Sequence, residues 1–365
     1  MWKEYDCKLM FEDGTEYPGY SFGDTREAVC EIVFNTSMAG YQEILSDPSY
    51  TYQAVVMTYP LIGNCGINQD DYETERPTMG ALIVSEYNDF PSNFRSVDTL
   101  GAVMRRYHIP GIYGVDTRKL TRYIRDFGSR KVLLTDIRTS SEKGMKLLAE
   151  TPVPADAVER VSRKEIVTFE KQGAKFHVAA IDCGMKQNIV RSLQRRDCAV
   201  TVVPYNTSAD EIERMMPDGV FVSNGPGNPE EVSCVTDTIR ALRGKYPVFG
   251  ICLGHQLICL SYGAKCYKLK FGHRGGNHPV QNIQTGKIEI TSQNHSYAVA
   301  EESLADTPLT VTHRNLLDGT VEGVCCREDR IFSVQYHPES APGPEDSAYL
   351  FDRFIELMRE GRKDA

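Results

Sequence analysis

The chain contains 365 residues, of which 41% are hydrophobic and 25% are charged, and its formal net charge at pH 7 is −9. This composition is typical of a soluble globular protein, and the length favours two domains. The acidic balance argues against a nucleic-acid-binding surface, and no apolar stretch is long enough to cross a bilayer. We therefore expect a protein that binds neither nucleic acid nor membrane.

The sequence contains eleven cysteines, an odd number scattered along its length. This pattern favours reduced thiols over a disulfide framework, and no signal-peptide core follows Met1. We therefore expect a cytoplasmic protein. The cysteines and histidines also lack the ligand spacing of metal sites, so we expect no metal in this chain.

The first domain is expected over residues 1–150 and mixes strands with helices. Short apolar runs bounded by turn residues predict strands over 9–11, 28–34, 52–58 and 80–84. Apolar residues at helical spacing then predict a helix that Ser96 caps and that ends at Pro110.

A second helix is predicted to begin after Asp116 and to stop at Gly128. Its expected buried face comprises Leu120, Tyr123, Ile124 and Phe127. Its opposite face carries Arg118, Lys119, Arg122 and Arg125. Such a basic face is either simply solvated or, in an acidic protein, a docking surface for a partner.

Periodicity fades over residues 151–174, which we interpret as a linker. Over residues 175–365, short apolar runs alternate with amphipathic segments. The strand-like runs are 176–181, 199–203, 219–222 and 248–251. This alternation predicts an α/β fold with a doubly wound, mostly parallel sheet, whose functional loops lie at the carboxyl ends of the strands. Antiparallel patterns follow, and the last helix is expected to bury Phe351, Phe354, Ile355 and Met358.

A loop poor in side chains follows the run over 219–222. It reads Ser223-Asn224-Gly225-Pro226-Gly227-Asn228-Pro229. A loop of this composition is either only a tight turn or a rigid source of backbone N–H donors for an oxyanion.

The run over 248–251 leads into a G-x-C-x-G pattern formed by Gly250, Cys252 and Gly254. Small residues two before and two after a nucleophile allow the sharp strand-to-helix turn that exposes its side chain. At a helix N-terminus, unpaired N–H groups and the macrodipole favour a thiolate. Cys252 is either a buried structural cysteine or, as the two glycines indicate, a nucleophile.

A cysteine nucleophile requires a base and a group that orients it. Alternation through Phe332, Val334 and Tyr336 predicts a strand that Pro338 ends. Residues two apart in an extended segment point the same way, so Glu339 is placed to orient His337. A histidine at a strand end is otherwise structural.

Neighbouring ends of parallel strands meet at one edge of a sheet. The N–H groups of Gly227 and Leu253 are therefore expected within reach of one bound carbonyl. Together with Cys252, His337 and Glu339, they would complete an acyl-transfer site.

These motifs carry a family resemblance. Residues 250–256, 224–227 and 337–339 together resemble the triad-type (class I) glutamine amidotransferase domain. Residues 34–50, 116–121 and 272–280 resemble the small, glutaminase subunits of carbamoyl-phosphate synthase. The resemblance covers essentially the whole chain.

The resemblance implies hydrolysis of glutamine by a Cys-His-Glu triad and transfer of ammonia to a large subunit. That partner would use ATP and magnesium to make carbamoyl phosphate for pyrimidine or arginine synthesis, and no cofactor is expected in this chain. The glutamine-contacting positions that it implies are Ser49, Gly225, Gly227, Leu253, Gln256, Asn294, Ser296 and Tyr297.

One position departs from the family pattern, because Ser296 stands where glycine is usual. If that position required positive φ, serine would add strain or narrow the pocket. Two other functions keep the same scaffold: a free-standing amidase or γ-glutamyl hydrolase, and a non-enzymatic regulatory subunit. The additional N-terminal domain counts against the first, and the intact triad counts against the second.

Overall fold

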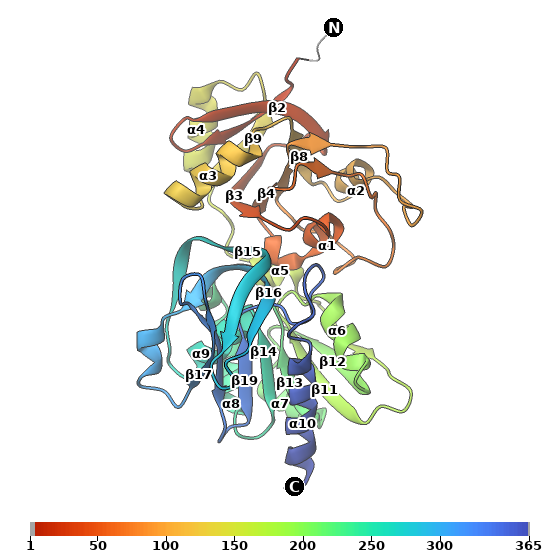
Figure 1. Cartoon of the computed structure of the whole chain (residues 1–365), viewed down its shortest axis with the longest axis vertical. Coiled ribbons are helices and arrows are strands. Elements are labelled where there is room, and N and C mark those ends of the chain that lie inside the picture. The colour runs from red at the N-terminus through yellow and green to blue at the C-terminus, as the bar shows by residue number, and fades with distance from the viewer. Residues whose placement is uncertain (1–3, 364–365) are drawn as a thin grey trace. The chain divides into compact units, whose positions relative to one another are not determined.

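The computed structural model describes residues 4–363, which divide into two units (Figure 1). Unit 1 comprises the residues up to Pro154 together with Lys270–Arg274, and unit 2 comprises Ala155–Leu269 and the residues from Gly275 onward. The segment 151–174, predicted as a linker, lies mostly in unit 2. It contains helix α5 (Ala157–Val161) and strand β10 (Val167–Phe169), and β10 pairs with β12 at the edge of the unit 2 sheet.

Unit 1 is a closed barrel with the strand order β1-β2-β8-β6-β4-β3-β9. Its strands are β1 (Cys7–Phe11), β2 (Glu16–Gly23), β3 (Ala28–Asn35), β4 (Gln53–Met57), β6 (Ala81–Ile83), β8 (Pro110–Tyr113) and β9 (Lys131–Asp136), and β5 (Leu61–Ile62) pairs separately with β7 (Glu86–Tyr87). The four predicted strands correspond to β1, β3, β4 and β6. The sequence patterns do not predict β2, β8 and β9.

The helices of unit 1 are α1 (Tyr41–Ser46), η1 (Pro48–Tyr50), α2 (Leu100–Arg106), α3 (Thr117–Phe127) and α4 (Ser141–Glu150). The predicted cap of α2 is wrong: the side chain of Thr99, and not that of Ser96, accepts the hydrogen bond from the Ala102 N–H. Both predicted ends of α3 are confirmed, since Asp116 accepts from the Lys119 N–H at 2.9 Å and Gly128 is the C-cap. The predicted burial of Phe127 is wrong, because its side chain is 58% exposed.

Strand β4 shows how the barrel is packed. Ala54 and Val56 belong to the apolar cluster that includes Leu120 of α3. The intervening Val55 and Met57 belong to a second cluster, which includes residues of α1 and α2. The period of two expected for a strand therefore places helices against both faces of β4.

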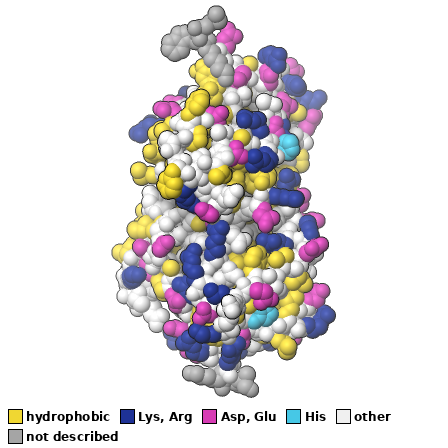
Figure 2. Space-filling model, turned by 90° about the vertical axis from the view of Figure 1, so that its right-hand side faces the viewer, with side chains coloured by type: hydrophobic (Ala, Val, Ile, Leu, Met, Phe, Trp, Pro, Cys, Tyr) yellow, Lys and Arg dark blue, Asp and Glu magenta, His cyan; other side chains and the backbone are white. Residues whose placement is uncertain are grey.

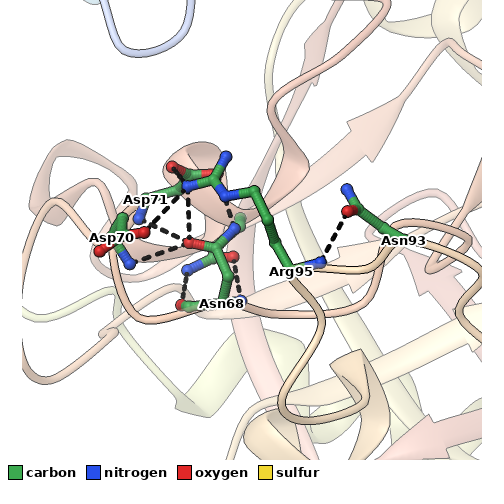
Figure 3. Close-up of polar contacts among 6 residues, drawn as sticks. Asn68, Asp70, Asp71, Asn93 and Arg95 are labelled. Carbon is green, nitrogen blue, oxygen red and sulfur yellow. Dashed lines mark hydrogen bonds and ion pairs between the residues drawn. The ribbon is translucent and has the colours of Figure 1, made fainter.

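Arg95 holds together two parts of the long connection between β4 and α2 (Figure 3). Its Nη2 lies 2.8 Å from Asp71 Oδ1 and 3.2 Å from Asp70 Oδ2, and its backbone N–H donates to Asn93. These groups are partly exposed, so they contribute little to stability and mainly order the loop.

Unit 2 is built on a ten-stranded sheet with the order β10-β12-β11-β13-β14-β19-β18-β17-β15-β16. Its strands after β10 are β11 (Phe176–Asp182), β12 (Cys198–Pro204), β13 (Gly219–Val222), β14 (Val248–Ile251), β15 (Cys266–Asn282), β16 (Ile288–Val299), β17 (Thr310–Asn315), β18 (Val321–Cys326) and β19 (Ile331–Val334). Strands β11 to β14 and β19 are parallel, and β17 and β18 are antiparallel. The predicted α/β fold with a mostly parallel sheet and a later antiparallel part is confirmed.

Helices cover both faces of this sheet (Figure 1). They are α6 (Gln187–Gln194), α7 (Ala209–Arg214), α8 (Ser233–Leu242), α9 (Leu253–Ser261) and α10 (Tyr349–Lys363), with 3-10 turns η2 (Pro229–Glu231) and η3 (Glu301–Leu304). Residues of α6 and α10 pack with alternate strand residues on one face, and those of α7, α8 and α9 pack on the other. The predicted burial of Phe351, Phe354, Ile355 and Met358 is confirmed.

All eleven cysteines are free thiols. Within residues 4–363, no helix is long and apolar enough to cross a membrane. Side chains of both charges are scattered over the face drawn in Figure 2.

Candidate active site

Cys252 occupies the sharp turn between β14 and α9. It is the N-cap of α9 and has φ 55° and ψ −105°, a conformation that is uncommon for a residue with a side chain. A Cβ at position 254 would lie 2.2 Å from Val222 O, and one at position 250 would lie 2.5 Å from Ile258 Cδ1. The two glycines are therefore required by close packing, while the strained backbone falls on the cysteine itself.

Replacing Gly254 by Ala should destabilise unit 2 by about 1–3 kcal/mol, because its Cβ would overlap a backbone carbonyl of β13. Thermal unfolding measures this change. Gly276→Ala is the control, since a Cβ there meets its nearest atom at an ordinary 3.5 Å. Equal melting temperatures for the two variants would show that the turn has room that the structure does not indicate.

The thiol of Cys252 is almost completely buried. Its Sγ lies 3.5 Å from the backbone oxygen of Asn294 in β16, and its own carbonyl accepts the first hydrogen bond of α9, from the Gln256 N–H. The first turn of α9 favours negative charge at this position. Strand β16 therefore forms one wall around the candidate nucleophile.

His337 and Glu339 form a buried pair just beyond the end of β19. His337 Nδ1 lies 2.7 Å from Glu339 Oε1. Burial opposes a charged imidazole, but the negative charges of Glu339 and Cys252 outweigh it and raise the pKa of His337 to about 10. The ring is therefore protonated near neutral pH, and it is electrostatically coupled to the thiol of Cys252.

Lys186 is a buried cation that the sequence patterns do not identify. Its Nζ lies 3.0 Å from Glu339 Oε1 and also donates to Ser340 O, while its backbone N–H donates to Asn224 Oδ1 at 3.1 Å. Burial alone would raise the pKa of Glu339, but the charges of Lys186 and His337 lower it to about 2. The only sequence signal for Lys186 is its place shortly after β11, at the carboxyl edge of the sheet.

The loop after β13 packs against the start of α9. Val222 pairs with Gly250, so both loops leave the sheet at the same edge. A Cβ at position 225 would lie 2.1 Å from Cys183 O and 2.9 Å from Leu253 Cδ2, and Gly227 has φ +88°. The loop therefore depends on glycine for both close approach and backbone conformation.

Comparisons with known proteins show the family of this chain. Family models match residues 9–134 (carbamoyl-phosphate synthase small chain, CPSase domain) and residues 179–357 (glutamine amidotransferase class-I). The carbamoyl phosphate synthase small chain of Staphylococcus epidermidis is 53% identical over 352 residues, which are 96% of this chain and 96% of that protein. The chain belongs to the carbamoyl-phosphate synthase small chain family.

Other members of the family are similarly close. The pyrimidine-specific small chain of Halalkalibacterium halodurans is 53% identical over 98% of each chain. The small chain of Fusobacterium nucleatum is 52% identical over 98% of this chain and 100% of that protein. The regions of this chain that match its relatives therefore span both units, and the family resemblance inferred from the motifs is confirmed.

Five of the eight glutamine-contacting positions implied by the family lie in α9 or β16, the two elements that adjoin Cys252. Gln256 lies one turn after it on α9, and its Nε2 donates to Tyr297 O at 2.8 Å and to Gln335 Oε1 at 2.9 Å. Asn294, Ser296 and Tyr297 all lie in β16. Gln256 thus joins α9 to the strand that borders the thiol.

Ser296 is not among the described residues with positive φ and lies within extended strand β16, so serine adds no backbone strain there. The strain considered from the sequence is therefore absent. Ser49 belongs to unit 1, where η1 buries it and its N–H donates to Asp47 Oδ1 at 2.9 Å. It remains a prediction from the resemblance.

Proposed function

We propose that this chain hydrolyses the side-chain amide of glutamine with Cys252, His337 and Glu339, and that it passes the ammonia to a large partner chain. The observation that carries the proposal is the buried His337–Glu339 pair, 2.7 Å apart, coupled to a cysteine at a strained strand-to-helix turn. The names of the relatives support carbamoyl phosphate as the product of the assembled enzyme.

In the first half of the reaction, the thiolate of Cys252 attacks the carbonyl carbon of the glutamine amide. The resulting oxyanion accepts hydrogen bonds from the N–H groups of Leu253 and Gly227. His337, protonated near neutral pH, gives its proton to the leaving nitrogen. The C–N bond breaks, ammonia leaves and a thioester remains on Cys252.

In the second half, water attacks the thioester while neutral His337 accepts its proton. The C–S bond breaks, the thiolate of Cys252 is regenerated, and the new carboxyl group gives its remaining proton to solvent as glutamate leaves. Glu339 keeps the imidazole in the required orientation throughout, and Lys186 fixes Glu339. Ser49, Gly225, Gln256, Asn294, Ser296 and Tyr297 are proposed to hold the remainder of the glutamine.

The partner supplies the synthetic half of the reaction. The sequence contains no G-x-x-x-x-G-K-[ST] phosphate-binding loop. ATP and magnesium are therefore assigned to the large chain, which combines ammonia with bicarbonate. Eleven free thiols fit a reducing compartment, and we place the enzyme in the cytoplasm.

A diazo-ketone analogue of glutamine tests the nucleophile and the substrate together. We expect one adduct, on Cys252, that glutamine suppresses, as measured by intact and peptide mass spectrometry. The exposed thiols of Cys65 and Cys234 are internal controls for non-specific alkylation. Labelling that is spread over these exposed thiols and is insensitive to glutamine, with and without the large chain, would contradict the proposed site.

A further inference from the structure

The exposed face of α3 concentrates positive charge in a protein that is acidic overall. Its exposed cations are Arg118, Lys119, Arg122 and Arg125, whereas Leu120 and Ile124 are buried in the barrel cluster. The chain as a whole has a net charge of −9. The local charge of this face is thus opposite in sign to that of the molecule.

The same face borders a groove within unit 1. The groove has a volume of about 450 Å³ and is lined by Thr58, Arg118, Thr121, Arg122 and Arg125. Thr58 follows directly after β4, so one wall comes from a strand end and the other from a helix. This volume is large enough for several side chains of a partner. We refer to these five residues as the arginine groove.

Two arginines of the groove form no ion pair with the residues that the structure describes. Arg125 Nε lies 2.8 Å from Asp126 Oδ1. By contrast, neither Arg118 nor Arg122 forms an ion pair with any side chain among residues 4–363. Asp126 attracts Arg122 only at a distance longer than an ion pair, so both guanidinium groups can bind an external anion.

Their arrangement does not help α3 to form. Arg118 and Arg122 are one helical turn apart, and like charges at this spacing destabilise a helix slightly. Arg118 also lies in the first turn, where the macrodipole disfavours a cation. An anion bound in the groove would offset both the repulsion between the two arginines and the unfavourable interaction of Arg118 with the helix macrodipole.

We propose that the arginine groove is a docking surface for an acidic segment of the large partner chain. This inference rests on the proposed function, which supplies the partner. The groove's arginines are exposed, so a small anion would compete with water and salt and bind weakly. A segment that is one part of a larger interface does not need high affinity of its own, and charge complementarity gives it orientation and a fast on-rate.

The test is the affinity of the chain for the purified large chain of the same organism. The variant is Arg118→Glu with Arg122→Glu, and the control is Arg105→Glu with Lys146→Glu, which makes the same change in net charge on exposed helices of unit 1. We expect the groove variant to raise Kd by about 10- to 100-fold and to flatten its salt dependence, with the control close to wild type. Glutaminase activity of the isolated chain, unchanged in both variants, shows that unit 2 is folded.

A photo-crosslinking residue, benzoylphenylalanine, at position 121 identifies the occupant. We expect the crosslinked peptide to come from the large chain and to contain neighbouring Asp or Glu residues. A peptide without acidic residues, or equal effects of the groove and control variants on Kd, would overturn the inference and leave the proposed function standing. If the wild-type chain hydrolyses glutamine but forms no complex, the proposed partner and the docking surface fail together.

Discussion

Replacement of Cys252 by Ala is expected to abolish glutamine-dependent synthesis of carbamoyl phosphate and to leave ammonia-dependent synthesis by the assembled enzyme intact. The variant removes the only atom that can form the thioester, and loss of a catalytic nucleophile lowers turnover by at least about 10³-fold. Supplied ammonia does not require that step. Both rates should be measured on the same complex, with glutamine and with an ammonium salt.

Cys234→Ala is the matched control, because it removes an exposed thiol from α8 without touching the turn. It should retain both activities. If Cys252→Ala reduced the two activities equally, the cysteine would be a structural element of the turn and not the nucleophile. The strained backbone at Cys252 makes this distinction necessary, since a substitution there can also alter the turn.

The part of the site that follows directly from local sequence is the strand-to-helix turn. The apolar runs over 219–222 and 248–251 coincide with β13 and β14, and the next residues after parallel strands must share one edge of the sheet. Gly250 and Gly254 then identify the turn, because few other features require glycine at both positions.

Lys186 could not be predicted in the same way. A lysine in a loop after a strand is usually solvated, and only the packed structure shows that its ammonium group is buried against Glu339. The role of Lys186 depends on Glu339, which is far away in the sequence. No local sequence pattern predicts a contact between two such distant residues.

The barrel of unit 1 shows a second limit of prediction from local sequence. Strand β2 contains Pro18 and Gly19, which weaken any strand pattern, and β8 begins at Pro110, which reads as the end of the preceding helix. Pairing with neighbouring strands overrides these local preferences. The same applies to the α2 cap, because the backbone places Thr99, and not the predicted Ser96, directly before the first helical residue Leu100.

The largest effect on stability is expected from Lys186→Met. The substitution keeps most of the apolar side chain but leaves the buried carboxylate of Glu339 with His337 as its remaining cation, and removing one partner of a buried ion pair lowers the free energy of unfolding by about 3–5 kcal/mol. Urea denaturation measures the change. Lys245→Met is the control, because its ion pair with Glu213 has a similar N–O distance of 2.7 Å but is solvated, and its loss should change the stability little.

The double variant Lys186→Met with Glu339→Gln separates charge from packing. With no buried carboxylate left to stabilise, most of the lost stability should return, as a double-mutant cycle would show. Activity should not return, because the negative charge that raises the pKa of His337 against its burial is gone. Unrecovered stability would instead indicate that Lys186 acts through packing or through its bond to Ser340 O.

The pH dependence gives an independent check with a defined sign. The pKa of Glu339 is lowered to about 2 in the folded chain, so its stabilising contribution is complete above its ordinary pKa of 4.5 and is lost as pH falls toward 2. The stability difference between wild type and Lys186→Met should therefore be largest above pH 4.5 and shrink on acidification. His337, with its pKa raised to about 10, behaves oppositely: its contribution is complete below pH 6.5 and is lost as pH rises through 10. If the stability difference between wild type and Lys186→Met were constant from acid to neutral pH, the buried Lys186–Glu339 ion pair would not stabilise the folded chain.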